Sequence, residues 1–144
     1  MTEKVLVLNG PNLGRLGSRE PEIYGQETLE DIAQACARWA DELNLEVAVR
    51  QTDDEAELVG WLHEAAEGQI PVVLNPAAFT HYSYSLRDAC AQLSVPLIEV
   101  HITNPATREE FRHTSVIGSV ATGTIAGFGI ESYRLALQAL AARG

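Results

Sequence analysis

The feature that most constrains the fold is a short apolar run that stops at a loop of glycine, proline and asparagine. Residues 5–8 (Val-Leu-Val-Leu) form the run, and Asn9-Gly10-Pro11-Asn12-Leu13-Gly14 follow at once. The run predicts a buried strand, and the loop predicts a mobile segment at its carboxyl end. In open α/β sheets, ligands bind beside this end of the strands. Arg15, Arg19 and Tyr24 come next in the same loop, so the opening of the chain predicts an anion site with a candidate acid or base.

Strand-like and helix-like segments alternate along all 144 residues. The pattern predicts strands near 5–8, 46–50, 71–74 and 96–100, and a short fifth strand near Val116–Val120. Helices are predicted from Thr28, from Asp53 or Asp54, over about 83–93 and over about 131–142. Such alternation with short connections predicts an α/β fold of one domain, residues 1–144. We expect a flavodoxin-like, doubly wound parallel sheet with helices on both faces.

Helix signals refine this prediction. Thr28 is a good N-cap, and Asp31 three residues later completes a variant capping box. The helix that follows is expected to bury apolar residues at helical spacing, namely Ile32, Cys36, Trp39 or Ala40, and Leu43. The next helix is expected to turn Leu58, Leu62 and Ala65 inward.

The formal net charge of −10 argues against nucleic acid or an anionic membrane as a partner. Against this background, four of the ten basic residues lie in or beside two predicted loops: Arg15, Arg19, Arg108 and Arg112. The single lysine, Lys4, lies at the amino end of the first strand. Schiff-base chemistry needs an active-site lysine, so the sequence predicts that none takes part.

Several other functional classes are disfavoured because the sequence lacks their motifs. Gly10, Gly14 and Gly17 lack the spacing and the Lys-Ser/Thr of a P-loop, and His63-Glu64 lacks the second histidine of a zinc-protease helix. No Gly-x-Ser-x-Gly elbow occurs. Cys36 and Cys90 lie in helix-like segments, which predicts reduced, buried thiols and no metal. With no apolar run of membrane length and no visible signal peptide, we expect a cytoplasmic protein.

Polar residues gather after the first four predicted strands, at 9–24, 51–53, 75–81 and 99–104. Parallel topology brings these loops to one edge of the sheet, which predicts an active site there. Glu99 and His101, two residues apart on a strand, point to the same side. A carboxylate beside an imidazole orients the ring and favours its charged form, which suits a general acid. A purely structural hydrogen bond is the alternative for this pair.

Tyr24 with the nearby arginines is a second candidate, because a neighbouring cation favours an ionised phenol that can act as a base. Simple packing of Tyr24 at the loop end is the alternative. Side-chain donors for a carboxylated, hydroxylated small molecule are also present: Asn12, Asn75, His81, Arg108 and Arg112. Pairing of Arg108 with the adjacent acidic residues, and a plain turn at Asn75-Pro76, remain alternatives.

Together these motifs resemble type II 3-dehydroquinate dehydratase. The resemblance covers nearly the whole chain and lies in Asn9-Gly10-Pro11-Asn12-Leu13, Arg19-Glu20-Pro21 to Tyr24-Gly25, Asn75-Pro76 with Thr80-His81, Glu99-Val100-His101, and Arg108-Glu109-Glu110-Phe111-Arg112. It implies reversible dehydration of 3-dehydroquinate to 3-dehydroshikimate in the shikimate pathway or in quinate breakdown, by anti elimination and without a cofactor or metal.

The resemblance also implies a role for each matching residue. Tyr24 would be the base and Arg19 the cation that keeps it ionised. Asn12 would help to hold a water against the enolate oxygen. His101 would be the general acid, oriented by Glu99. Substrate contacts would come from Asn75, His81, Asp88, Ile102, Thr103 and Arg112, and residues 14–24 would form a lid.

In the family, the position of Asp88 reaches a neighbouring subunit, which implies a homo-oligomer, a dodecamer built from trimers. Thr103 and Asp53 depart from the residues common in the family, serine and asparagine. Two other functions stay open: a non-catalytic flavodoxin-like module that binds a small carboxylate, and a cofactor-free hydro-lyase acting on a related cyclic hydroxy acid.

Overall fold

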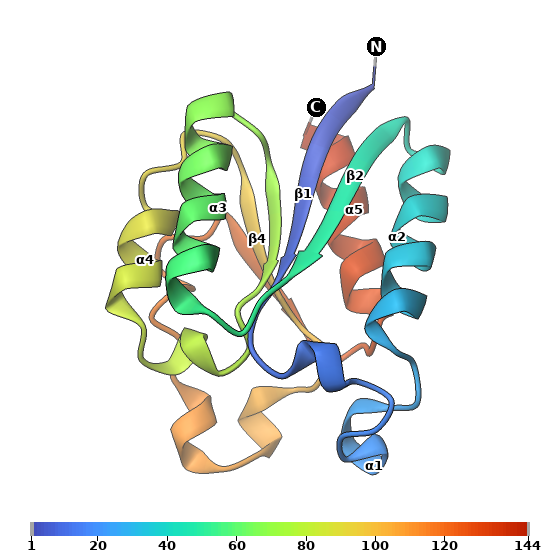
Figure 1. Ribbon diagram of the computed structural model, residues 1–144, viewed down its shortest axis with the longest axis vertical. Helices are drawn as coiled ribbons and strands as arrows, with labels where there is room; N and C mark the ends of the chain where they lie inside the picture. The colour runs from blue at the N-terminus through green and yellow to red at the C-terminus, as the bar shows by residue number, and fades with distance from the viewer. Residues whose placement is uncertain (1, 144) are drawn as a thin grey trace.

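A computed structural model describes residues 2–143 and contains a five-stranded parallel sheet (Figure 1). The strand order is β2-β1-β3-β4-β5, which is the flavodoxin order. This confirms the predicted fold class. The strands are β1 (Glu3–Asn9), β2 (Leu45–Gln51), β3 (Val72–Asn75), β4 (Leu97–His101) and β5 (Gly123–Ala126).

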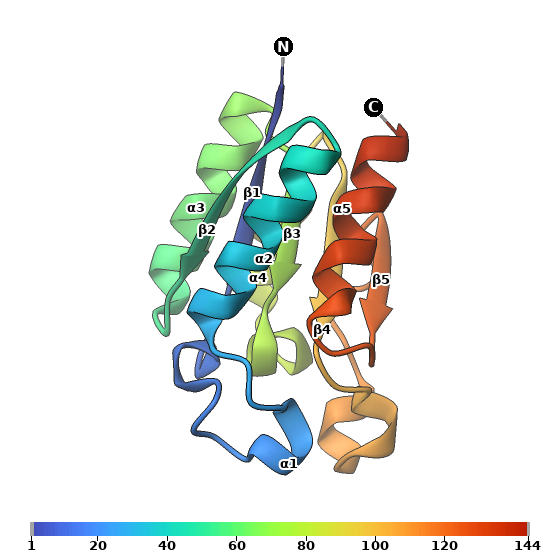
Figure 2. The ribbon, with the colours of Figure 1, turned by 90° about the vertical axis from the view of Figure 1, so that its right-hand side faces the viewer.

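Helices cover both faces of the sheet, as expected (Figures 1 and 2). One face carries α2 (Leu29–Glu42) and α5 (Glu131–Arg143), and the other carries α3 (Glu55–Gly68) and α4 (Tyr84–Cys90). Alternation along β1 explains the two layers, because Val5 and Val7 pack with α2 and α5 while Leu6 and Leu8 pack with α3 and α4. All four of these β1 side chains are fully buried.

The helix starts confirm the capping prediction. Thr28 caps α2 by accepting from the Asp31 backbone N–H at 3.1 Å, and the Asp31 carboxylate accepts from the Thr28 backbone N–H at 3.0 Å. The Asp54 side chain caps α3 by accepting from the Ala56 N–H. These caps satisfy backbone donors that the first helical turn leaves without partners.

The predicted fifth strand was placed wrongly. The segment Val116–Val120 contains turns, and β5 lies further on, where Gly123–Ala126 pair with Ile98–His101 of β4. Ile117 is nevertheless fully buried, in the core on the α3 and α4 side. A short apolar segment has the same residue pattern whether it forms a strand or only packs a side chain into the core, which explains the error. Helix α4 also ends at Cys90 rather than at Leu93.

Both cysteines are buried and free. Burial raises the pKa of the Cys36 and Cys90 thiols to about 12, so neither is a reactive thiolate near neutral pH. No helix within residues 2–143 combines the length and the apolar character that a membrane crossing requires.

Short elements from two parts of the chain lie beyond the carboxyl edge of the sheet (Figure 2). They are η1 (Leu13–Arg15) and α1 (Pro21–Tyr24) after β1, and η3 (Pro105–Thr107) and η4 (Glu110–His113) after β4; a fifth, η2 (Ala77–His81), follows β3 directly. Buried Leu13 and Leu16 anchor the first of these segments to the core beside α2 and α5. The short elements surround the candidate site.

Candidate active site

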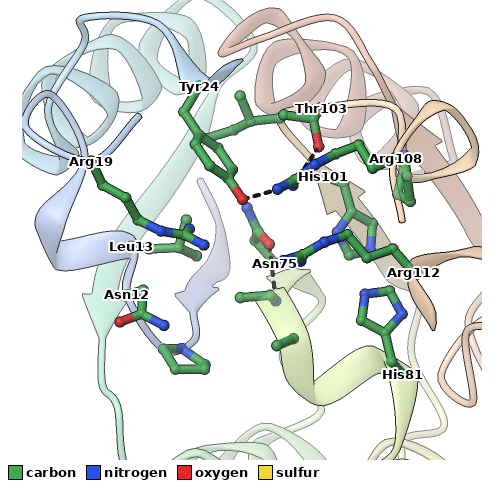
Figure 3. A pocket seen from close by; sticks show the side chains of 15 residues that line it. Asn12, Leu13, Arg19, Tyr24, Asn75, His81, His101, Thr103, Arg108 and Arg112 are labelled. Atoms are coloured by element: carbon green, nitrogen blue, oxygen red, sulfur yellow. Dashed lines mark hydrogen bonds between the residues drawn. The ribbon is translucent and has the colours of Figure 1, made fainter. Parts of the chain in front are cut away.

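A cavity of about 190 Å³ lies at the carboxyl edge of the sheet (Figure 3). The loops after β1, β3 and β4 line it, which are three of the four loops that parallel topology was expected to bring to this edge. Ten of the residues that the sequence singled out as candidates line it: Asn12, Arg19, Tyr24, Asn75, His81, His101, Ile102, Thr103, Arg108 and Arg112.

Tyr24 projects into the cavity from the end of α1 (Figure 3). Pro21 opens this single turn, in a position that suits proline. Arg108 donates from Nη1 to the phenolic oxygen of Tyr24 at 2.7 Å, and the Arg19 Cζ lies 4.5 Å from the ring centroid. Arg108 is therefore the cation in direct contact with the hydroxyl, and Arg19 lies over the ring.

Arg108 is the site residue whose place the sequence did not reveal. We expected Arg19 to be the cation at Tyr24 and grouped Arg108 with the carboxylate-binding donors. The structure places Arg108 at the hydroxyl, with a second contact to the Thr103 hydroxyl at 3.4 Å and a longer one to Glu109 at 3.8 Å. Its side chain is 13% exposed. Because Tyr24 and Arg108 are 84 residues apart, no local pattern links them.

Glu99 and His101 form the predicted pair on β4. The ring Nε2 of His101 lies 2.6 Å from Glu99 Oε2, and the Glu99 side chain is fully buried. The pair leaves Nδ1 as the ring nitrogen for the cavity. Burial opposes ionisation of Glu99, but hydrogen bonds from His101, Thr80 and Ser115 and the nearby imidazole outweigh it and lower its pKa. The carboxylate is therefore ionised near neutral pH and accepts a hydrogen bond from His101 Nε2.

Acid stability should reflect this pair. Because the pKa of Glu99 is lower in the folded state than its ordinary value of 4.5, its ionisation stabilises the fold above that value. The contribution is lost as the pH falls through the lower, folded-state pKa. Denaturant unfolding of wild type and Glu99→Gln should be measured across a pH series. The difference between their free energies of unfolding should be largest above pH 4.5 and should disappear on acidification. A difference that does not depend on pH would contradict this.

Asn75 is held by a chain of hydrogen bonds whose directions are all determined. Asn9 donates from Nδ2 to the Arg50 carbonyl, so its Oδ1 is free to accept, at 2.6 Å, from the Tyr133 hydroxyl of α5. The Tyr133 oxygen then accepts from Asn75 Nδ2 at 2.9 Å, and Asn75 Oδ1 accepts from the Ala77 N–H at 3.1 Å. One Nδ2 hydrogen of Asn75 remains for the cavity, so Asn75 is oriented as a donor.

Tyr133→Phe should destabilise the protein. Tyr133 is fully buried, and the change leaves Asn9 Oδ1 without its donor and an Asn75 hydrogen without its acceptor. A buried polar group that loses its partner costs about 1–3 kcal/mol. Chemical denaturation should show that the free energy of unfolding falls by an amount in this range. Tyr82→Phe, at a residue that is 59% exposed, should change it little. Equal stability of Tyr133→Phe and wild type would mean that these hydrogen bonds contribute nothing to the free energy of unfolding.

The remaining candidates have defined partners. The backbone N–H of Asn12, in a left-handed conformation (φ 69°), donates to Asp53 Oδ1 at 2.8 Å. Asp53 thus anchors the loop that carries Asn12, as an asparagine could through the same oxygen. His81 donates from Nδ1 to the Thr114 carbonyl at 2.7 Å, since a carbonyl only accepts. Arg112 donates from Nε to Glu109 at 2.9 Å, which leaves its terminal nitrogens for a ligand.

Glu99 lies behind His101 and does not line the cavity, and Asp88 is a second predicted site residue outside it. Asp88 lies on α4, its side chain is 73% exposed, and it contacts Arg87 at 3.3 Å. This chain by itself therefore does not bring Asp88 to the other candidates. Within residues 2–143, no group of three or more histidine, cysteine, aspartate or glutamate side chains is arranged to hold a metal ion.

Comparisons with known proteins identify the family of this chain. The family described as "Dehydroquinase class II" matches residues 3–141. The 3-dehydroquinate dehydratase of Salinispora arenicola is 62% identical over 140 residues, which cover 97% of this chain and 98% of that protein. The protein of the same name from Mycobacterium tuberculosis is 54% identical over 142 residues, 98% of this chain and 97% of the relative.

A solved structure is also similar to this chain over nearly its whole length. The crystal structure of the type II dehydroquinase from Propionibacterium acnes superimposes with a TM-score of 0.97 at 56% sequence identity, and the match covers 99% of this chain and 98% of that chain. The match extends over the short elements of the site as well as the sheet. By the family match over residues 3–141 and by its similarity to these relatives and to this structure, the chain belongs to the class II dehydroquinase family.

Proposed function

We propose that this chain catalyses the reversible dehydration of 3-dehydroquinate to 3-dehydroshikimate, with no cofactor. One observation carries the proposal: a tyrosine held by an arginine and a histidine held by a buried glutamate line the same cavity. A base and an acid in one site are what an elimination of water needs. The relatives are named for this reaction.

Tyr24 is the base in this proposal. As a phenolate paired with Arg108, it removes the proton on the carbon next to the substrate ketone, and the electron pair moves into an enolate. Arg108 stabilises the phenolate before the transfer through its 2.7 Å bond, and Arg19 adds positive charge at the ring. The neutral phenol that results is the ordinary form of tyrosine near pH 7.

Asn12 and His101 act on the oxygen atoms. The enolate oxygen is stabilised by a water that Asn12 helps to hold, an oxyanion-type contribution. His101 then donates a proton to the departing hydroxyl as the enolate collapses to the conjugated ketone. Glu99 keeps the ring in place and offsets its positive charge. Base and acid approach from opposite faces of the substrate ring, which makes the elimination anti.

Substrate binding is assigned to the other polar residues of the cavity. Arg112 is the partner of the substrate carboxylate, because its terminal guanidinium nitrogens are free for a bidentate bond. Asn75 donates its remaining hydrogen to a substrate hydroxyl, and His81 and the Ile102–Thr103 backbone hold the others. Three arginines make this cavity cationic in a protein of net charge −10, so an anionic substrate is drawn to it.

We further propose that Asp88 works in the site of a neighbouring copy, in a dodecamer built from trimers, and that residues 14–24 close over the substrate as a lid. The exposure of Asp88 outside its own cavity supports the first point. Light scattering coupled to size exclusion should give a mass of twelve chains. Mixing Asp88→Asn with Tyr24→Phe protomers should restore some activity if Asp88 acts across subunits, and no restoration would place its action elsewhere.

The reaction itself is tested by ultraviolet absorbance with 3-dehydroquinate, because the product is a conjugated enone. Growth of the enone band in untreated, EDTA-treated and borohydride-treated samples would support a dehydratase that needs neither metal nor Schiff base. Binding by calorimetry without any absorbance change would favour the carboxylate-binding module. We place the reaction in the cytoplasm, in the shikimate route to aromatic amino acids.

A further inference from the structure

We propose that Thr80 and Ser115 are positioning residues for the general acid, because their hydroxyls form a directed chain that fixes the Glu99 carboxylate behind His101. Thr80 lies on η2, on the β3 side of the site, and Ser115 follows η4. Neither residue lines the cavity. The inference rests on the proposed role of His101, and it adds the groups that act on it from outside the cavity.

The direction of the chain follows from its backbone end. Ser115 Oγ accepts from the backbone N–H groups of Gly118, at 2.9 Å, and Ile117, at 3.2 Å. Its lone pairs are therefore occupied, so the Ser115 proton must point onward as a donor. The shortest onward contact is Thr80 Oγ1 at 2.7 Å, and the contacts to the two Glu99 oxygens are longer, at 3.1 and 3.2 Å.

Thr80 continues the chain. Its hydroxyl, in a residue only 1% exposed, donates to Glu99 Oε2 at 2.5 Å, and the same oxygen lies 2.6 Å from His101 Nε2. Every proton from Gly118 through Ser115 and Thr80 thus points toward one carboxylate oxygen. Hydrogen bonds in such a chain strengthen one another in a low-dielectric interior. The carboxylate that holds His101 is itself held by the Thr80 hydroxyl, whose oxygen accepts from Ser115.

The arrangement affects where the acid proton resides. A carboxylate that accepts from the Thr80 hydroxyl, which Ser115 polarises in turn, is favoured over the neutral acid, so the proton shared with His101 stays on the imidazole. The lowered pKa of Glu99, to which both hydroxyls contribute against its burial, agrees with this. If the Thr80 hydroxyl is removed, the proton moves toward Glu99, and less of the enzyme carries a charged His101.

Few other titratable groups face the pair. Cys90 of α4 lies close enough for the Glu99 charge to add to the effect of burial on its pKa, and it stays neutral. Arg19, Tyr24, His81, Arg108 and Arg112 face the cavity that His101 lines. None of these five contacts Thr80 or Ser115 through a side-chain hydrogen bond among the described residues, so a change at Thr80 reaches the site through Glu99.

Thr80→Val is the first variant, because it keeps the shape and removes the hydroxyl. We expect kcat to fall by about tenfold with KM little changed, a fraction of the ~10²–10⁴-fold that a general acid contributes. The limb on which activity falls with rising pH should move up, because a Glu99 carboxylate with one donor fewer holds the proton that it shares with His101 more strongly. Thr80→Ser keeps the hydroxyl and should restore both values.

The controls separate position from packing. Thr124→Val, at an exposed threonine of β5, should match wild type. Ser115→Ala should shift the same limb of the pH–rate profile in the same direction as Thr80→Val, but by a smaller amount. If Thr80→Val does not fold, Ser115→Ala is the variant that tests the inference. An unshifted limb in a folded variant, or equal losses in Thr80→Val and Thr80→Ser, would overturn the inference. An inactive wild type would instead overturn the proposed function.

Discussion

Tyr24→Phe is expected to abolish turnover and leave substrate binding intact. The change removes the one oxygen that can accept the substrate proton, and kcat should fall by roughly 10⁴-fold, the upper range for a positioned acid or base. Arg112, Asn75 and His81, which we assign to binding, are untouched. Enone absorbance would measure kcat, and calorimetry with 3-dehydroquinate would measure affinity. Because kcat and kcat/KM should fall together, the loss belongs to the transition state.

Tyr82→Phe is the matched control for this change. The Tyr82 side chain is 59% exposed, and its ring contacts Phe79 with edge-on geometry. It should turn over substrate at the wild-type rate. Loss of the phenol at Tyr24 also frees Arg108 from its 2.7 Å bond, so thermal unfolding must show that the variant is folded. A folded Tyr24→Phe protein with near-normal turnover would remove Tyr24 from the mechanism.

His101→Asn is the second large expected effect. The substitution keeps a polar side chain beside Glu99 and removes the group that gives a proton to the departing hydroxyl. We expect kcat to fall by roughly 10²–10⁴-fold. The limb of the pH–rate profile that reports the protonated acid should disappear as well, because no titrating group remains in that position.

His63→Asn serves as the control here, because His63 is exposed on α3 and lies outside the cavity. Proton abstraction should survive in His101→Asn, since Tyr24 and Arg108 are unchanged. Exchange of substrate hydrogen with deuterated solvent, followed by NMR, would then show enolate formation without dehydration. If the variant keeps both its rate and its pH profile, another group supplies the proton.

Arg108 and Arg19 show which features of the site could be predicted from the sequence and which could not. The cluster of basic residues near two loops correctly indicated a cationic cavity, because loops after parallel strands meet at one edge. Which arginine meets the Tyr24 hydroxyl depended on the path of the chain through η3 and on a contact across 84 residues. The sequence next to Arg108 suggested a pair with acidic neighbours instead, and the 3.8 Å contact to Glu109 exists beside the shorter bond to Tyr24.

Local spacing by itself determined the first four strands, most helices, the Thr28 cap and the common side of Glu99 and His101. These features depend on residues a few positions apart, so periodicity and caps reveal them. Tertiary structure alone decided the place of β5, the partner of Tyr24, the orientation of Asn75 by Tyr133, and the chain from Ser115 to Glu99. Each of these joins segments distant in sequence, and such contacts form only when the helices and loops pack on the finished sheet.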